Sequence, residues 1–230
     1  MHPPEAPRAL LFDLDGTLVD TAADLVGALQ AVRAHLGLLP LQDTALHQYA
    51  SEGAIGLIRR GIPEALRGDS EGLRRVFLAH YAAHLADHSR PYPGARALLA
   101  RCAELGIATA IVTNKPEGLA RAVLKALELD FAVIVGGDTL PVRKPDPAPL
   151  HLALEQLGVE AAAAWMVGDD PRDIEAGRAA GCPTVAAAWG YLPDGRRAED
   201  LGADWIAADL EAITQRLEGA LTPAAPIRPL

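Results

Sequence analysis

The chain has 230 residues, of which 50% are hydrophobic and 22% are charged, a balance typical of a folded domain and not of a disordered or fibrous chain. Its formal net charge of -9 argues against a nucleic-acid partner, because a phosphate backbone is bound by clustered cations. Two cysteines are too few for a disulfide framework or a zinc cluster, so we expect reduced thiols and a cytoplasmic protein. Neither a signal peptide nor a membrane-spanning run is predicted, so no membrane partner is expected.

Short apolar runs alternate with helical stretches along most of the chain. The first apolar run, residues 9–12, ends abruptly at two aspartates, as a buried strand does where it leaves a sheet. Similar runs lie at residues 107–112, 132–135, 165–167 and 184–187, and helical stretches lie at residues 95–105, 116–127, 147–157 and 171–180. This alternation predicts an α/β fold with a doubly wound, Rossmann-like parallel sheet as its core.

Residues 20–90 interrupt this alternation. They contain helical patterns at residues 20–35, 45–50, 55–61 and 71–86, with no strand pattern between them. We interpret residues 20–90 as an inserted α-helical cap that two crossings, near Val19 and Arg90, join to the core by a hinge suited to closure over a substrate. The core then comprises residues 1–19 and 91–222, and the proline-rich residues 223–230 are expected to form a flexible tail.

The first polar segment at the end of a predicted strand is FDLDGTLVD, residues 12–20. Along an extended chain, Asp13 and Asp15 lie on the same side, and Gly16 releases the chain into a turn. Two carboxylates so close persist when a cation lies between them or one stays protonated. A bare Asp-Gly turn is the competing interpretation of this segment taken alone.

Two further segments follow the next strands. Thr113 and Asn114 precede a helix and are typical either of an anion-binding turn or of an ordinary helix cap. Lys144 lies in the segment RKPDP, where prolines stiffen the loop. The chain has only three lysines, so a lysine in a rigid loop at the sheet edge is a candidate to bind phosphate; a solvated surface lysine is the alternative.

A fourth segment, VGDDPRD, puts acidic residues after the strand at residues 165–167. Asp169 leaves this strand as Asp13 leaves the first, and Asp173 falls in the first turn of the following helix. Aspartate at a helix start also serves as a plain cap, and we expect one of Asp170 and Asp173 to do only that.

In this order, the four segments resemble the motifs of the haloacid dehalogenase superfamily of phosphoryl-transfer enzymes, over nearly the whole chain. The phrases FDLDGTLVDT, VTNKP, KPDPAPL and GDDPRDIEAGRAAGCPTV look like those of phosphoglycolate phosphatases in particular. The resemblance implies a phosphatase in which Asp13 attacks phosphorus and forms an aspartyl-phosphate, and Asp15 protonates the leaving oxygen and then deprotonates water.

The resemblance also implies a Mg²⁺ cofactor bound by Asp13, the main-chain carbonyl of Asp15 and Asp169, with Asp173 outside the direct ligands or bound through water. Thr113, the main-chain amide of Asn114 and Lys144 would then hold the phosphoryl oxygens. Asp15 argues against a dehalogenase, which has no leaving oxygen to protonate. Residues 20–90 contain no lysine for a Schiff base, which argues against phosphonate cleavage.

Substrate choice in this superfamily belongs to the cap. The segment SEGAIG places Ser51 and Gly53 where relatives carry a substrate loop, and Arg59 or Arg60 is a candidate to pair with a substrate carboxylate, although both are also ordinary residues of a solvated helix. The resemblance favours 2-phosphoglycolate, a small phosphomonoester of carbohydrate metabolism, as the substrate. One alternative is a phosphatase of N-acetylmuramic acid 6-phosphate. Another is an enzyme of sugar phosphates, either a phosphatase or a mutase.

Other interpretations remain at this level. A phospho-receiver shares the acidic residues, hydroxyl, lysine and metal, but it has no use for Asp15 or for a cap; a catalytically silent binding module is a further alternative. His80, His84 and His88 recur at four-residue intervals and are interpreted as a polar stripe on the long cap helix, with a zinc site as the competing interpretation. Oligomeric state is not predicted.

Overall fold

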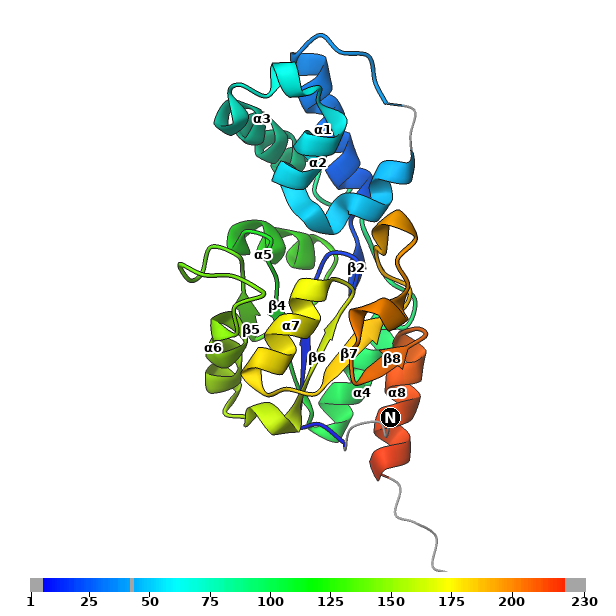
Figure 1. Ribbon diagram of the computed structural model, residues 1–230. Helices are drawn as coiled ribbons and strands as arrows, with labels where there is room; N and C mark the ends of the chain where they lie inside the picture. Colours follow the sequence, from blue (N-terminus) through cyan, green and yellow to red (C-terminus); the bar gives the residue numbers. More distant parts are fainter. Residues whose placement is uncertain (1–5, 42–43, 222–230) are drawn as a thin grey trace, which may run out of the picture.

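A parallel sheet lies at the centre of the computed structural model, which describes residues 6–41 and 44–221 (Figure 1). Among these residues the sheet has six strands, in the order β5-β4-β1-β6-β7-β8, and each neighbouring pair is parallel. The strands are β1 (Ala9–Phe12), β4 (Ala108–Val112), β5 (Val133–Val135), β6 (Ala164–Gly168), β7 (Thr184–Ala187) and β8 (Trp205–Ala207). The predicted α/β fold class is therefore confirmed.

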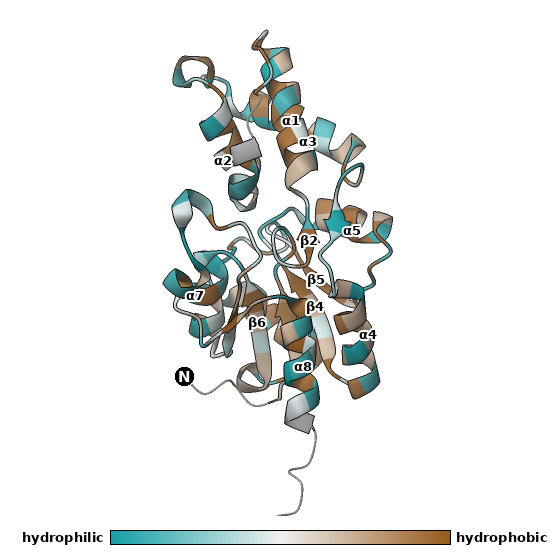
Figure 2. Ribbon diagram, turned by 90° about the vertical axis from the view of Figure 1, so that its right-hand side faces the viewer, coloured by the Kyte–Doolittle hydropathy of each residue, from teal (hydrophilic) through white to brown (hydrophobic). Residues whose placement is uncertain are grey.

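Helices cover both faces of this sheet. They are α4 (Ala95–Leu105), α5 (Glu117–Ala126), α6 (Ala148–Leu157), α7 (Pro171–Ala180) and α8 (Leu210–Leu221). Side chains alternate along β1, so Leu10 and Phe12 pack in one core cluster with α4, α5 and α8, whereas Ala9 and Leu11 pack in another with α6 and α7. All four residues are fully buried, which is why β1 is a continuous apolar run. Hydrophobic residues gather accordingly in the interior around β4 and β5 in Figure 2.

The predicted strands and helices of the core are present, with small shifts at their ends. Glycines in the left-handed conformation end three helices, at Gly106, Gly158 and Gly181. Pro171 occupies the first turn of α7, but Pro116 and Pro147 lie one residue before α5 and α6 instead of inside them. The sequence analysis did not predict β8 and α8.

A second group of helices lies apart from the sheet, above its carboxyl edge in Figure 1. It comprises α1 (Ala22–His35), the 3-10 helix Thr44–Glu52, α2 (Gly53–Gly61), the 3-10 turn Glu64–Leu66 and α3 (Ser70–Ala83). The chain enters and leaves this group through a two-stranded antiparallel ladder of β2 (Val19–Asp20) and β3 (Arg90–Pro91). The carboxylate of Asp24 ties the two crossings together, since it accepts hydrogen bonds from the main-chain N–H and the hydroxyl of Ser89 at 2.7 and 2.6 Å.

The predicted histidine stripe is present only in part, because the rings of His80 and His84 lie 4.5 Å apart between centroids but His88 lies beyond the helix. Helix α3 ends at Ala83, and His84 lies at its C-cap with non-helical dihedral angles. His84 pairs with Asp87 at 2.8 Å, whereas the main-chain N–H of His88 donates to Asp24 on α1. Among the described residues, no group of histidine, cysteine and acidic side chains there has the spacing of a metal site.

Two further sequence predictions concern the ends of the chain and membranes. The tail at residues 223–230 lies outside the described residues. Within residues 6–41 and 44–221, no helix is both long and apolar enough to cross a bilayer. Cys102 and Cys182 are buried and form no disulfide.

Candidate active site

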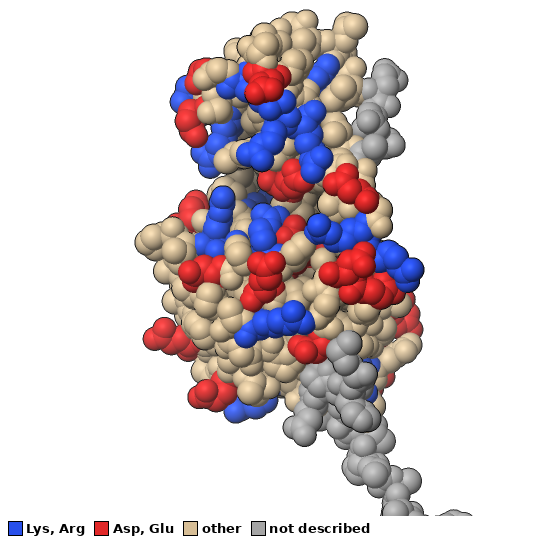
Figure 3. Space-filling model, viewed as in Figure 1, with Lys and Arg blue, Asp and Glu red and all other residues tan. Residues whose placement is uncertain are grey.

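The three central strands of the sheet deliver polar residues to one edge. Asp13 follows β1, Thr113 follows β4 and Asp169 follows β6, and these strands are neighbours in the sheet. Parallel strands end on the same edge, which is where open α/β sheets bind ligands. A cavity of about 720 Å³ lies between this edge and the cap helices. Figure 3 shows basic side chains on the cap and on the core, above and below the narrow part of the molecule where the cap meets the core.

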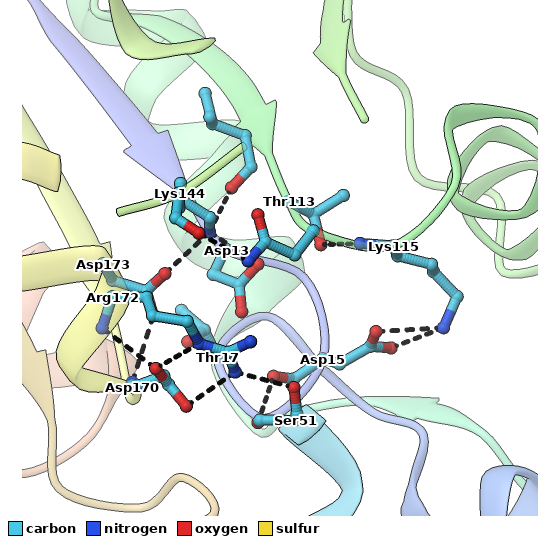
Figure 4. A network of polar contacts seen from close by, with 12 residues as sticks. Asp13, Asp15, Thr17, Ser51, Thr113, Lys115, Lys144, Asp170, Arg172 and Asp173 are labelled. Atoms are coloured by element: carbon cyan, nitrogen blue, oxygen red, sulfur yellow. Dashed lines mark hydrogen bonds and ion pairs between the residues drawn. The ribbon is translucent and has the colours of Figure 1, made fainter. Parts of the chain in front are cut away.

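Three carboxylates and one ammonium group form the acidic cluster at the base of the cavity. Asp13, Asp169 and Asp173 are all buried, and each offers a ligand oxygen within 4.8 Å of the other two. The Nζ of Lys144 lies 3.0 Å from Asp13 and 2.7 Å from Asp173, and it donates to the main-chain carbonyl of Val112 at 2.6 Å (Figure 4). One lysine thus faces three carboxylates, so the cluster carries an excess of negative charge when all three are ionised.

This excess shows in the protonation equilibria of the cluster. Burial, together with the charges of Asp13 and Asp173, raises the pKa of Asp169 well above its ordinary value. Burial also raises the pKa of Asp173 to about 7, against the opposing effect of Lys144. Burial alone would lower the pKa of Lys144, but Asp13 and Asp173 outweigh it and raise that pKa. Buried oxygen ligands with unbalanced charge are suited to a hard divalent cation.

Small residues leave room for Asp169. Its two carboxylate oxygens accept hydrogen bonds from the Thr17 hydroxyl at 2.7 Å and from the main-chain N–H of Tyr191 at 2.8 Å. A Cβ at Gly16 would lie 2.4 Å from Asp169 Oδ2, and one at Gly190 would lie 2.1 Å from Asp169 Cβ. Gly16 also has a φ of +87°, in the left-handed region that favours glycine. The glycine of the first motif is therefore required both by the turn and by the neighbouring carboxylate.

Asp15 lies beside this cluster but has its own partners. Its carboxylate oxygens lie 2.8 and 3.0 Å from the Nζ of Lys115, and Oδ1 also accepts a hydrogen bond from the Thr21 hydroxyl at 2.6 Å. From the sequence, Asp13 and Asp15 were predicted to persist together when a cation lies between them or one stays protonated. Instead, two of the three lysines of the chain reach the site, and each carboxylate has a separate ammonium partner.

The residues after β4 hold the loop of Lys144. The Nδ2 of Asn114 donates to the main-chain carbonyl of Lys144 at 2.9 Å, and the buried Oδ1 of Asn114 makes no hydrogen bond to a described residue. Thr113 is buried, and its hydroxyl accepts a hydrogen bond from the main-chain N–H of Lys115 at 3.2 Å. Both residues line the cavity beside Asp13 and Lys144. The side chain of Asn114 thus positions Lys144, a contact that spacing along the chain does not reveal.

The cap contributes a loop that touches the core. Ser51 Oγ lies 3.3 Å from both the main-chain carbonyl of Asp15 and Oδ2 of Asp169, and the Ser51 carbonyl accepts from Arg172 at 2.8 Å. Gly53 and Arg59 also line the cavity, with Arg59 exposed to solvent. The three cap residues singled out from the sequence therefore surround the same cavity as the acidic cluster.

Asp170 and Asp173 form a reciprocal cap at the start of α7, so capping does not separate their roles in the way predicted from the sequence. Asp170 caps α7 through the main-chain N–H of Arg172 at 2.9 Å, and its carboxylate also pairs with the Arg172 guanidinium at 2.7 Å. Although burial raises the pKa of Asp170, the hydrogen bonds and charge of Arg172 outweigh burial and leave that pKa lowered. Asp173 Oδ2 accepts a hydrogen bond from the main-chain N–H of Asp170 at 3.1 Å, and Asp173 also belongs to the acidic cluster.

Four residues of the site carry no role in the sequence analysis: Lys115, Tyr81, Tyr191 and Arg172. Lys115 lies in the second motif, so a count of the three lysines could have drawn attention to it. Tyr81 and Tyr191 approach the site from the cap and from the loop after β7, and the site residues that they contact lie far away in sequence. Arg172 precedes Asp173 in α7, but its hydrogen bond to the Ser51 carbonyl joins residues 121 positions apart. Their contacts depend on the folded arrangement.

Comparisons with known proteins agree with this geometry. The model of the haloacid dehalogenase-like hydrolase family matches residues 10–187. A phosphoglycolate phosphatase of Rhodospirillum rubrum is 45% identical over 195 residues, which cover 80% of this chain and 81% of that protein. A phosphoglycolate phosphatase of Chromobacterium violaceum is 40% identical over 204 residues, covering 86% of this chain and 90% of the relative.

A solved structure resembles the whole arrangement of sheet and helices. It is described as a predicted phosphoglycolate phosphatase from Haemophilus somnus and superposes with a TM-score of 0.80 at 28% sequence identity. The match covers 91% of this chain and 97% of that one, so it includes the helices between β2 and β3 as well as the sheet.

Proposed function

This chain belongs to the haloacid dehalogenase-like hydrolase family, and from that premise we propose that it is a phosphoric monoester hydrolase acting on 2-phosphoglycolate. The observation that supports the chemistry is the pair Asp13 and Asp15, each at the cavity with its own lysine and with Asp169 and Asp173 beside the first. The observation that supports the substrate is the likeness to phosphoglycolate phosphatases over most of the chain.

In the proposed reaction, a carboxylate oxygen of Asp13 attacks phosphorus as the bond from phosphorus to the glycolate oxygen breaks. Asp15, in its protonated form, gives its proton to that leaving oxygen, and glycolate departs. Asp15 then takes a proton from water, whose oxygen attacks the phosphorus of the aspartyl-phosphate and releases inorganic phosphate and free Asp13. Thr113, the main-chain amide of Asn114 and Lys144 hold the phosphoryl oxygens whose charge is redistributed during both transfers.

The acidic cluster fits the divalent cation on which enzymes of this family depend, and we propose that the cation is Mg²⁺. Its donors are oxygen atoms, which a hard cation prefers, and they are buried with more negative than positive charge. Asp13 and Asp169 would hold it together with the main-chain carbonyl of Asp15, and Asp173 lies close enough to bind directly or through water. When bound, the ion neutralises charge on the phosphoryl group.

Removal of the cation is expected to lower the phosphatase rate by about 10²-fold or more, because the charge on the phosphoryl group is then left uncompensated. Mg²⁺ added back should restore the rate and also raise the melting temperature, since a ligand that binds only the folded state stabilises it. The measurement is a thermal melt with and without Mg²⁺, for the wild type and for Asp169→Asn. An Mg²⁺-dependent rise that is equal in both proteins would contradict the assignment of Asp169.

The cap and the cellular setting follow from the same proposal. We propose that residues 20–90 act as one cap that opens about the β2 and β3 crossings, supported by the loop at Ser51 that touches both sides. The partner is then a small phosphorylated metabolite that enters the cavity between the sheet edge and the cap. A cytoplasmic location is supported by two buried cysteines that form no disulfide.

A substrate panel tests the proposed function. The purified protein with Mg²⁺ is assayed for phosphate release from 2-phosphoglycolate, N-acetylmuramic acid 6-phosphate and common sugar phosphates, and the substrates are compared by kcat/KM. We expect 2-phosphoglycolate to have the highest value. A preference for N-acetylmuramic acid 6-phosphate or for a sugar phosphate would keep the phosphatase chemistry and overturn the substrate, whereas conversion of a sugar phosphate to its isomer would identify a mutase.

A further inference from the structure

One cation of the cavity has no function in the reaction described so far. Lys115 is buried, and its Nζ contacts Asp15 at 2.8 and 3.0 Å (Figure 4). The same Nζ lies 4.4 Å from the centroid of the Tyr81 ring on α3. The side chain of Lys115 is a buried cation, since its Nζ forms an ion pair with the Asp15 carboxylate. Lys144 already serves the phosphoryl side of the cavity.

A hydrogen-bond donor without a partner lies next to this cation. The Tyr81 side chain is 1% exposed and lines the cavity, and its hydroxyl makes no hydrogen bond to any described residue. Burial raises the pKa of Tyr81 to about 12, so the hydroxyl keeps its proton. Buried polar groups are almost always hydrogen-bonded, and those that are not are commonly completed by a ligand or water. One wall of the cavity therefore offers a cation and a free donor together.

We propose that Lys115 and Tyr81 bind the carboxylate of the substrate and so determine its specificity, an inference that rests on the proposed function. In 2-phosphoglycolate, a single methylene carbon separates the leaving oxygen from the carboxylate. Asp15 has to touch the leaving oxygen to protonate it, so a cation in contact with Asp15 is within reach of that carboxylate. The proposal rests on two short separations: the leaving oxygen and the carboxylate are one carbon apart in the substrate, and Asp15 and Lys115 are in contact in the protein.

The arginines of the cavity are less suited to this carboxylate, and two of them, Arg74 and Arg143, are partly or fully exposed. Arg60, one of the two candidates from the sequence, is bound to Glu52 at 2.6 Å and stacks 3.5 Å over the Tyr49 ring. Arg172 is held by Asp170, and Arg59 is exposed, so a carboxylate bound there would remain in contact with water. A charged hydrogen bond is stronger where water is excluded, as it is at Lys115.

The carboxylate would also change the partners of Asp15. In the free protein, Lys115 is the ammonium group bound to Asp15; in the complex, the substrate carboxylate shares or replaces that contact, and Asp15 turns toward the leaving oxygen. A substrate that lacks the carboxylate leaves Asp15 on Lys115 and is selected against in kcat as well as in KM. Binding of a non-reacting group is thereby used to assemble the catalytic geometry.

The test compares two substrates that differ in this carboxylate, 2-phosphoglycolate and ethyl phosphate. We expect the ratio of their kcat/KM values to fall by about 10²-fold in Lys115→Met, the loss typical of a charged hydrogen bond. The variant also frees Asp15 when ethyl phosphate is bound, because that substrate leaves Asp15 on Lys115, and this gain for ethyl phosphate lowers the ratio in the same direction. Lys115→Arg, which keeps the cation, should retain most of the preference.

A second variant tests the hydroxyl separately. Tyr81→Phe is expected to lower the same ratio by about 10-fold, without lowering the melting temperature, because the hydroxyl makes no hydrogen bond within the described protein. Lys125→Met is the matched control: this lysine lies exposed in the last turn of α5, the helix that follows Lys115, so its loss should leave the ratio unchanged.

The outcomes separate this inference from the proposed function. A wild type that prefers 2-phosphoglycolate, with variants at Lys115 and Tyr81 that keep the full preference, would overturn the inference and leave the proposed function intact. A wild type that hydrolyses both substrates equally well would overturn the choice of substrate and the inference with it. If Lys115→Met fails to fold, Lys115→Arg and Tyr81→Phe carry the test, and an unchanged ratio in Tyr81→Phe then counts against the proposal.

Discussion

Replacement of Asp13 by asparagine is expected to lower the steady-state rate of phosphate release by at least about 10⁴-fold, because the amide oxygen is a poor nucleophile and forms no aspartyl-phosphate. The substitution keeps the shape of the side chain at the end of β1, where Asp13 is buried beside Lys144. The protein should therefore remain folded. The measurement is phosphate release from 2-phosphoglycolate with Mg²⁺ present, together with a thermal melt of the same preparation.

The matched control is Asp130→Asn. Asp130 is exposed, lies in the loop between α5 and β5, and is not among the residues that line the cavity. The rate of this variant should equal that of the wild type. Wild-type activity in Asp13→Asn would remove Asp13 as the nucleophile, whereas equal losses in the two variants would point to a general effect of the substitution.

Replacement of Asp15 by asparagine is expected to lower turnover of 2-phosphoglycolate by about 10² to 10⁴-fold, the usual contribution of a general acid and base. The size of the loss should depend on the leaving group in the first step. A nitrophenolate ion leaves without a proton, so Asp13 still attacks an aryl phosphate in this variant. Water attack on the phosphorylated enzyme remains slow, because no base accepts the proton of the water.

The expected observation is a burst of nitrophenol, equal in amount to the enzyme, followed by slow turnover. Rapid-mixing absorbance measures it directly. If Asp15→Asn releases nitrophenol at a constant slow rate with no burst, transfer to Asp13 is the slow step, and the claim that this step needs no proton from Asp15 with an aryl phosphate is contradicted. If its turnover of both substrates matches the wild type, Asp15 has no proton-transfer role at all.

Much of the core could be predicted because burial leaves a clear pattern in the sequence. The bounds of β1 and β7 were predicted to the residue, since both strands are fully buried and consist of apolar or small residues. The three residues of β8 are a shorter run, and Trp205 and Ile206 are only partly buried, so the pattern is weak there. The helical insertion could be predicted because no strand pattern occurs in the sequence between Asp20 and Arg90.

The site could be predicted as a set of residues but not as a set of contacts. Asp13, Thr113 and Asp169 follow neighbouring strands, so strand ends alone bring them together. The pairing of Lys115 with Asp15 joins residues 100 positions apart, and the approach of Tyr81 depends on how the cap lies over the core. The histidine stripe was predicted too long for a local reason. The four-residue spacing of histidines in the sequence continues past Ala83, but the backbone leaves the helix there.

The central claim is that Asp13 takes the phosphoryl group covalently. The most direct test is to quench Asp15→Asn in acid during the burst with an aryl phosphate and to locate the added phosphoryl group by mass spectrometry of the digested protein. We predict that the label lies on the peptide containing residues 9–20, at Asp13, and that it disappears when Asp13→Asn is added to the same variant. A burst with no covalent label, or with a label on any other residue, would contradict the account.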